Sequence, residues 1–268
     1  MDIGNSVGLL CEGVDMAWYE WPLILSSVFY QLAIGAFIVL GGCILTGKLC
    51  FGQMDRLHRT MPALWLLLFS GLFLREITLI FSQVPVAYTL GQEALMVVGF
   101  FALALIYWFA EKGLVGSDRL RKAYLMLVIA AGVGYLLHGL MVRSEQWLVA
   151  SHFLATTLCG GTLLAHASLV KAEHKVDEFN RTLPYVGAGI MVVCLLTGLP
   201  QLAGLATLAE TQGDIAPFIA QVTSLGLLIA AVGVWFMPLL TKSKPALNVM
   251  TFALALIIAS SYCAGVGY

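Results

Sequence analysis

Eight long apolar stretches dominate the pattern of hydrophobic and polar positions along the chain, and each is bounded by charged residues, proline or glycine. A stretch of about 20 residues is long enough for a helix to cross a hydrocarbon core about 30 Å thick. Lipid cannot satisfy free backbone polar groups, and the alternating segments of a membrane β-barrel are not seen. The pattern therefore predicts an all-α integral membrane protein, a bundle of about eight transmembrane helices forming a single domain over residues 1–268. The predicted helices cover approximately residues 21–45, 61–82, 90–110, 123–142, 147–170, 183–206, 216–240 and 246–265, after an outer N-terminal tail over residues 1–20.

The basic residues predict how this bundle is oriented. Twelve of the 14 lysines and arginines fall in the first, third, fifth and seventh connections. The other connections and both termini contribute only Arg143, and Arg75 lies inside a span. Basic connections tend to stay on the cytoplasmic side of a membrane. We therefore expect both termini on the outer, periplasmic side.

Composition narrows the classes of protein further. Hydrophobic residues make up 60% of the 268 residues and charged residues only 11%, too few to cover a soluble domain. A net charge of −1 without a strongly basic region argues against nucleic-acid binding. The six cysteines are scattered without a CxxC spacing, so we expect no metal in this protein. The tail before Glu20 has no basic residue, unlike a secretory signal, and we expect it to be retained.

Polar side chains inside the spans are the candidates for function, because charges in lipid are costly. Eight of them belong to the first five spans or their ends: Gln31, Arg75, Glu76, Gln92, Glu93, His138, Arg143 and His152. Most lie toward the outer side, whereas the last three spans hold almost no ionisable residue and are expected to act as scaffold. A quinol site needs such a set, because quinol oxidation releases two protons as well as two electrons. Each hydroxyl then needs an acceptor that can take its proton.

Glu93 is the expected proton acceptor, because at the outer start of the third span it can receive a proton and release it outward. Arg75 is suited to stabilise a neighbouring carboxylate or the developing quinone oxygens, and the remaining six residues are candidates to bind quinol. Structural roles stay open beside these. Arg75 and Glu76 are compatible with pairing to other helices, Glu93 with capping a helix start, and each histidine with an interhelical hydrogen bond.

A haem site is an alternative use of the histidines. His152 and His166 are fourteen residues apart, which places them on nearly one helical face and about 21 Å apart along the axis. Two haems, each with two histidine ligands, need four buried histidines, and only these two and His138 are available. A single haem between His138 and His152 stays open. His166 lies one turn before Lys171, which favours a side chain that reaches the inner surface.

The start of the first span carries a family resemblance. The relevant residues are Trp18-Tyr19-Glu20-Trp21-Pro22-Leu23, then Phe29, Gln31, Gly35 and Phe37-Ile38-Val39-Leu40. They resemble the opening of the DmsC family, the membrane anchor subunits of dimethyl sulfoxide reductase-type molybdoenzymes. In that family a W-x-E-W-P-L segment enters the first of eight helices. Further similar segments are Gln92-Glu93, which resembles an acidic position associated with menaquinol binding, Met141-Val142-Arg143 and Gly160-Gly161.

The resemblance implies a function and partners. It implies an anchor in the bacterial inner membrane that oxidises menaquinol near the outer face and passes electrons to an iron–sulfur subunit and a molybdopterin catalytic subunit docked there. The anchor itself would hold no haem and would not reduce the terminal acceptor. One departure concerns a histidine that the family places in an H-L-G-S-P-like segment. The corresponding residues 79–85 hold none here, and Gln83, His138 or His152 is a candidate replacement.

Two other functions stay open. One is an NrfD-like proton-translocating subunit or an ion-coupled transporter, which predicts ionisable residues that continue to the inner side of the membrane. The inner halves of the spans hold little besides His166, and this counts against a conduction path. The other is a purely structural anchor without quinol chemistry.

Overall fold

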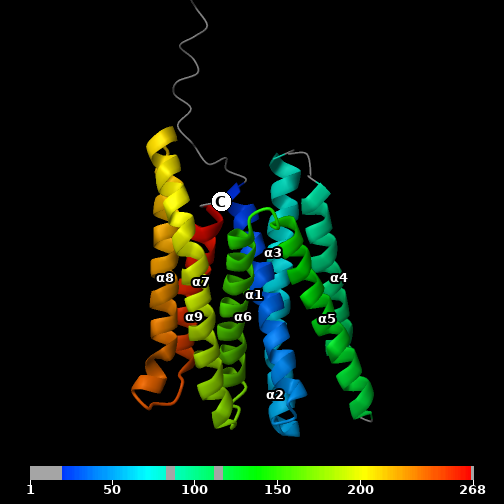
Figure 1. The fold of residues 1–268 in the computed structure, drawn as a ribbon. Helices are drawn as coiled ribbons and strands as arrows, with labels where there is room; N and C mark the ends of the chain where they lie inside the picture. The colour runs from blue at the N-terminus through cyan, green and yellow to red at the C-terminus, as the bar shows by residue number, and fades with distance from the viewer. Residues whose placement is uncertain (1–19, 83–87, 112–116, 267–268) are drawn as a thin grey trace, which may run out of the picture.

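The fold is a bundle of antiparallel α-helices (Figure 1). The computed structural model describes residues 20–82, 88–111 and 117–266, so the predicted outer tail lies outside the described residues apart from Glu20. The helices of the described part are α1 (Glu20–Leu45), α2 (Phe51–Thr60), α3 (Pro62–Ser82), α4 (Tyr88–Ala110), α5 (Asp118–Val142), α6 (Trp147–Lys171), α7 (Asp177–Gln212), α8 (Ala216–Leu240) and α9 (Leu247–Val266). Eight candidate spans are long and apolar enough to cross a membrane, and α2 forms the start of the span that α3 completes. The predicted all-α membrane bundle is confirmed.

Helix α2 was not predicted. It has ten residues, begins with a capping box between Cys50 and Gln53, and continues almost directly into α3. One of its faces is buried through Leu57 and His58, whereas Phe51 is exposed. Such a short amphipathic helix gives no long apolar stretch, and for this reason the hydropathy pattern did not reveal it.

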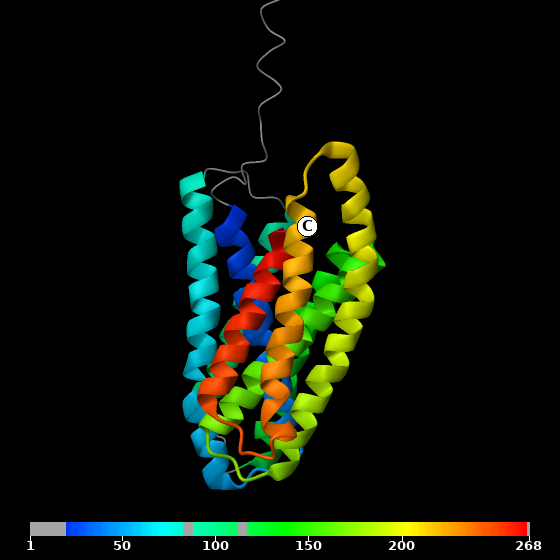
Figure 2. The ribbon, with the colours of Figure 1, turned by 90° about the vertical axis from the view of Figure 1, so that its left-hand side faces the viewer.

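Helix α7 is longer than the apolar stretch that predicted it. It starts at Asp177 instead of residue 183 and ends at Gln212 instead of residue 206. Asp177 and Glu178 suit the positive N-terminal end of a helix, and Gly213 ends it with a left-handed φ of +76°. At about 1.5 Å per residue its 36 residues span roughly 54 Å, so α7 extends beyond the hydrocarbon core. Figure 2 shows it reaching past α6 and α9.

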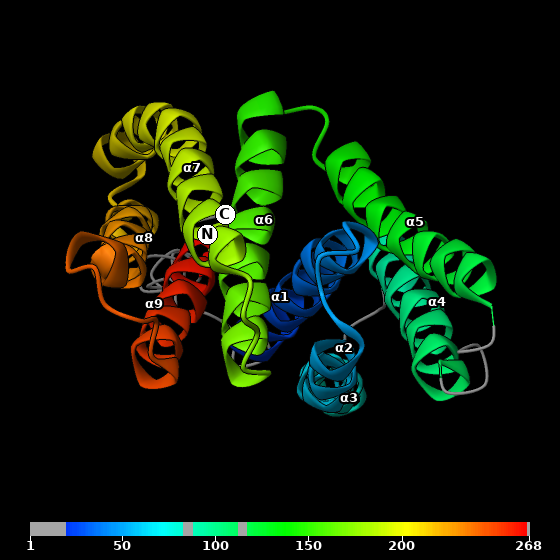
Figure 3. The same cartoon turned by 90° about the horizontal axis from the view of Figure 1, so that it is seen from below.

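Helices α1 and α6 form the centre of the bundle. Each packs against the other and against α5 and α9, and they are the most deeply buried spans. Figure 3 shows them between α7, α8 and α9 on one side and α3, α4 and α5 on the other. Their backbones approach closely at two small residues. A Cβ built on Gly161 would lie 2.4 Å from the carbonyl carbon of Gly35, so only glycine fits there.

The two ends of the bundle differ in charge. We call the end where α1 begins and α9 finishes the terminal end, and the opposite end the basic end (Figure 1). The connections from α1 to α3, from α6 to α7 and from α8 to α9 lie at the basic end. Their described residues include Lys48, Arg56, Lys175 and Lys242. The connection from α5 to α6 lies at the terminal end and carries Arg143.

Candidate functional site

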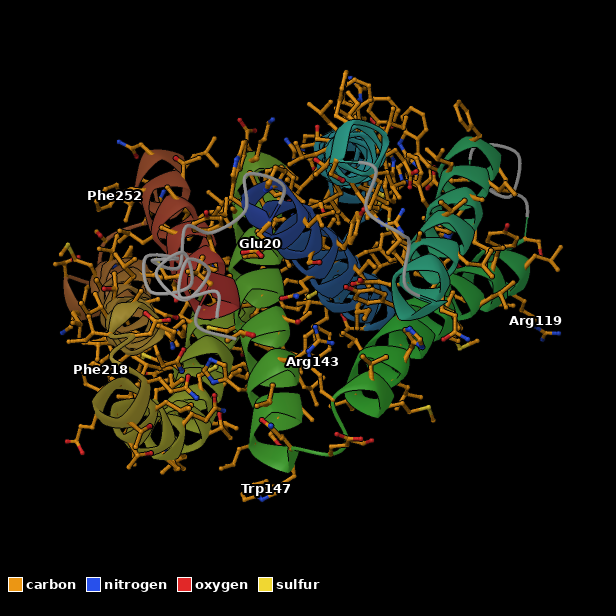
Figure 4. The ribbon with its side chains drawn as sticks, turned by 90° about the horizontal axis from the view of Figure 1, so that it is seen from above. Glu20, Arg119, Arg143, Trp147, Phe218 and Phe252 are labelled. Carbon is orange, nitrogen blue, oxygen red and sulfur yellow. The ribbon has the colours of Figure 1, made fainter. Side chains whose placement is uncertain are left out.

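A cavity of about 540 Å³ opens at the terminal end of the bundle. Its walls come from the first turns of α1, from α3, α4, α5 and α6, and from the last turns of α9. In the view from the terminal end, Arg143 lies between α5 and α6, whereas Trp147 points away from the bundle (Figure 4). The volume is in the range of small-molecule sites, and most of the wall is apolar.

One wall of the cavity holds a half-buried carboxylate. Glu93 on α4 accepts a hydrogen bond from the Tyr135 hydroxyl of α5, with 3.2 Å between the two oxygens. Arg75 on α3 is buried, lines the same cavity and pairs with its neighbour Glu76. Tyr30 of α1 is fully buried and lines the same cavity. The carboxylate of Glu93 thus lines the cavity together with a cation and the phenol of Tyr30, and a second phenol, that of Tyr135, donates to it.

Arg143 forms a second wall, where α5 turns into α6. Its Nη1 donates to the carbonyl oxygen of Gly139 at 3.2 Å. Its guanidinium lies 4.4 Å from the ring centroid of Phe153, an attractive cation–π geometry. Gly139 makes this packing possible, because a Cβ there would lie 2.5 Å from the Phe153 ring. These contacts hold a positive charge at the cavity without an acidic partner among the described residues.

His152 of α6 forms part of the cavity wall and is only 3% exposed. Its Nδ1 lies 3.2 Å from the carbonyl oxygen of Cys194 and 3.2 Å from the hydroxyl oxygen of Thr197. A carbonyl oxygen can only accept, so Nδ1 carries the ring proton in the neutral imidazole. Nε2 is then an acceptor, and it is buried without a hydrogen-bond partner among the described residues. A buried acceptor of this kind normally has a partner, supplied by water or by a ligand.

Two glutamines lie on the helices behind His152, and hydropathy did not reveal them. A Cβ built on Gly198 of α7 would lie 3.2 Å from the His152 ring and 3.3 Å from the amide nitrogen of Gln221, so these two residues converge there. Gln221 of α8 is completely buried, and neither of its amide atoms has a partner among the described residues. The same is true of the amide atoms of Gln201, one turn after Gly198. The unsatisfied atoms favour ordered water behind the imidazole.

The cavity brings together five of the eight residues predicted from the sequence: Gln31, Arg75, Glu93, Arg143 and His152. Glu76, Gln92 and His138 are not among its lining residues, and Glu76 is mostly exposed. His138 is partly buried on α5, and its Nε2 has no partner among the described residues. Gln83 lies outside the described residues. Among the last three spans, expected to serve as scaffold, α9 also supplies part of the cavity wall.

The described residues contain few side chains that could bind a metal ion together. No three histidine, cysteine, aspartate or glutamate residues gather among them in a way that could hold an ion. His166 is engaged on both ring nitrogens, since Nδ1 accepts from Trp235 and Nε2 bonds to Asn180. It is therefore not available as a ligand of a second haem stacked below one at His152.

Comparison with known proteins shows to which family this protein belongs. The family model of the DMSO reductase anchor subunit (DmsC) matches residues 14–266. The protein belongs to the DmsC family. It is 27% identical over 267 residues to the C subunit of the anaerobic dimethyl sulfoxide reductase of Escherichia coli (strain K12), an alignment that covers 90% of the present sequence and 91% of that subunit. It is also 27% identical over 266 residues to the anaerobic dimethyl sulfoxide reductase subunit YnfH of the same organism, covering 90% of each.

Family membership confirms the resemblance predicted from the sequence and fixes the coarse role. A DmsC protein is a multi-pass membrane anchor of a reductase complex, and an anchor subunit implies catalytic and electron-transfer partner subunits. The terminal-end cavity of this anchor brings together Arg75, Glu93, Arg143 and His152.

Proposed function

We propose that this DmsC protein oxidises menaquinol in the terminal-end cavity and passes the two electrons to an iron–sulfur subunit docked on that end. A molybdopterin subunit then reduces the terminal acceptor. The observation that carries the proposal is the pairing, in one membrane-embedded cavity, of the Glu93 carboxylate with the His152 imidazole. Each is a proton acceptor suited to one hydroxyl of a quinol.

The proposed chemistry balances at these two groups. Oxidation of the quinol to the quinone releases two electrons and two protons. Glu93 takes one proton from the hydroxyl near α4, while Tyr135 holds its carboxylate in position. His152 takes the other, since its contacts with Cys194 and Thr197 leave Nε2 as the basic atom. Arg75 and Arg143 favour the negative charge that develops on the oxygens as the protons leave.

The orientation expected from the basic residues favours outward release of both protons. The basic end is expected to face the cytoplasm of a bacterium, so that the cavity and both termini face the outer side of the inner membrane. On this arrangement the partner subunits dock on the outer face. Protons from Glu93 and His152 leave through the open side of the cavity that both residues line.

A proton-translocating subunit is the less favoured function. A path across the membrane needs ionisable groups below the cavity. Helix α6 carries no charged residue or histidine between His152 and His166, and α4 carries no charged residue after Glu93 until its end. Along α4 and α6, a stretch without charged residues or histidine thus separates the terminal-end cavity from the basic end.

Removing this subunit tests the proposal as a whole. We expect the complete complex to reduce its acceptor with either a menaquinol analogue or a reduced dye, because a dye can deliver electrons to the partner subunits directly. The partner subunits without the anchor should keep the dye-driven rate and lose the quinol-driven rate. Quinol-driven turnover that persists without the anchor would contradict the proposal.

The role of His152 has its own test. His152→Asn keeps an N–H close to the position of Nδ1, so the contacts with Cys194 and Thr197 are retained, but it removes Nε2. We expect quinol-driven turnover to fall at least about tenfold, with dye-driven turnover unchanged. His138→Asn is the matched control, since His138 does not line the cavity, and it should stay within about twofold of the wild type. Equal rates for both variants would remove the imidazole from the mechanism.

A further inference from the structure

A second cavity lies at the basic end of the bundle, far from the first. Its volume is about 550 Å³, and it is bounded by the first turns of α7, the last turns of α8 and the connection to α9. Its lining includes His166 of α6, which is fourteen residues and about 21 Å along the helix from His152. The cavity is therefore separate from the proposed quinol site.

Three cations line this cavity without a carboxylate partner. Arg181, Lys242 and Lys244 form no ion pair with any described residue. Five other cations of the basic end form salt bridges, with Arg121 and Lys122 sharing Asp118: Lys48, Arg56, Arg59, Arg121 and Lys122. Asp177 also lines the cavity, which leaves an excess of two positive charges on its walls. Unneutralised cations around a concave site attract an anion.

The two lysines are held by an ordered turn. The Ser243 backbone N–H donates to the carbonyl oxygen of Pro238 at 2.9 Å, and the hydroxyls of Thr241 and Ser243 are 2.9 Å apart. Lys242 has a left-handed backbone with φ +53°, which is uncommon for a residue other than glycine. Lys242 and Lys244 are therefore presented from a defined loop conformation.

A buried series of hydrogen bonds orients one neutral donor of the cavity. The Trp235 indole N–H donates to Nδ1 of His166 at 2.9 Å, so the ring proton of the neutral imidazole sits on Nε2. Nε2 then donates to the side-chain oxygen of Asn180 at 3.2 Å. This bond fixes the side-chain oxygen of Asn180 as an acceptor and leaves its amide N–H groups as donors. Asn180 lines the cavity together with the Ser243 hydroxyl.

Apolar surface adjoins these donors. Tyr185 lines the cavity and is 61% exposed, and Met237 and Leu240 near the end of α8 are exposed as well. A free anion would use only the donors, whereas a phospholipid would also cover this surface with its acyl tails. We propose that the basic-end cavity binds the phosphate headgroup of an anionic phospholipid, with the acyl tails along α7 and α8. Basic pockets between membrane helices are suited to such headgroups.

Lipid affinity of the purified subunit in detergent tests the proposal. The variant replaces Arg181, Lys242 and Lys244 with glutamine, and the probes are phosphatidylglycerol, phosphatidylcholine and inorganic phosphate. We expect the wild type to bind phosphatidylglycerol more tightly than phosphatidylcholine. The triple variant should bind phosphatidylglycerol roughly 10- to 100-fold more weakly, with phosphatidylcholine unaffected. Inorganic phosphate should not displace the lipid, because it lacks the apolar contacts.

A matched triple variant separates the cavity from general surface charge. Arg119, Lys171 and Lys175 are also basic-end cations without an ion pair among the described residues, but they do not line the cavity. Replacing them with glutamine should leave the affinity for phosphatidylglycerol within about twofold of the wild type. Equal weakening in both variants would overturn the proposal. Displacement of the lipid by millimolar inorganic phosphate would overturn the lipid as the ligand and leave a site for a free anion.

Discussion

The Glu93→Gln complex should lose quinol-driven turnover by at least about 100-fold while it assembles normally and keeps its dye-driven turnover. Glutamine has nearly the same shape as glutamate, and its side-chain oxygen can still accept the hydrogen bond from Tyr135. It cannot take a proton at neutral pH. The substitution therefore removes the proposed base and little else. The measurement compares the two rates in membranes that contain equal amounts of complex.

Two further variants sharpen this test. Tyr135→Phe removes only the hydroxyl that holds Glu93 in position, so its loss should be smaller, roughly two- to tenfold. Glu145→Gln is the matched control, because Glu145 is an exposed carboxylate of the α5–α6 connection and does not line the cavity. It should behave like the wild type. Normal quinol turnover in an assembled Glu93→Gln complex would remove Glu93 from the mechanism.

The membrane makes much of this fold predictable from sequence. Because every span must be apolar over about 20 residues, hydropathy alone located all eight. It could not locate the parts of helices that lie outside the hydrocarbon core. These include both ends of α7, which are set by Asp177 and Gly213. Hydropathy also did not reveal α2, which follows an amphipathic pattern.

The candidate site was predictable only in part, for a related reason. Ionisable residues in spans are costly and therefore rare. For this reason Arg75, Glu93 and His152 could be selected from the sequence. Which of them meet depends on how each helix is rotated, and a pattern of residue types does not fix rotation. Tyr135 and Gln221 show what is missed. A tyrosine or a single glutamine in a span is unremarkable until packing brings it to a carboxylate or an imidazole.

The contact between α1 and α6 is expected to be the most sensitive point of the bundle. A Cβ on Gly161 would lie 2.4 Å from the carbonyl carbon of Gly35 and 2.7 Å from the backbone nitrogen of Ala36. Both contacts would be with backbone atoms, so rotation of a neighbouring side chain cannot relieve the overlap. Gly161→Ala should therefore separate the two helices and lower the free energy of unfolding by about 1–3 kcal/mol or more. Denaturant titration of the purified subunit in mixed micelles measures this change.

A control variant separates the steric effect of the added methyl group from the effect of helix propensity on the free energy of unfolding. Alanine favours a helix over glycine by up to about 1 kcal/mol, so a substitution that meets nothing should be neutral or stabilising. Gly134 of α5 is such a position, with nothing within 4 Å of a built Cβ. Gly134→Ala should thus be at least as stable as the wild type, and equal stability of the two variants would contradict the close α1–α6 contact. Gly161→Ala should also reduce quinol-driven turnover, because α1 carries Gln31 and α6 carries His152 in the walls of one cavity. Stability and the proposed quinol oxidation are then expected to depend on the same contact between two glycines.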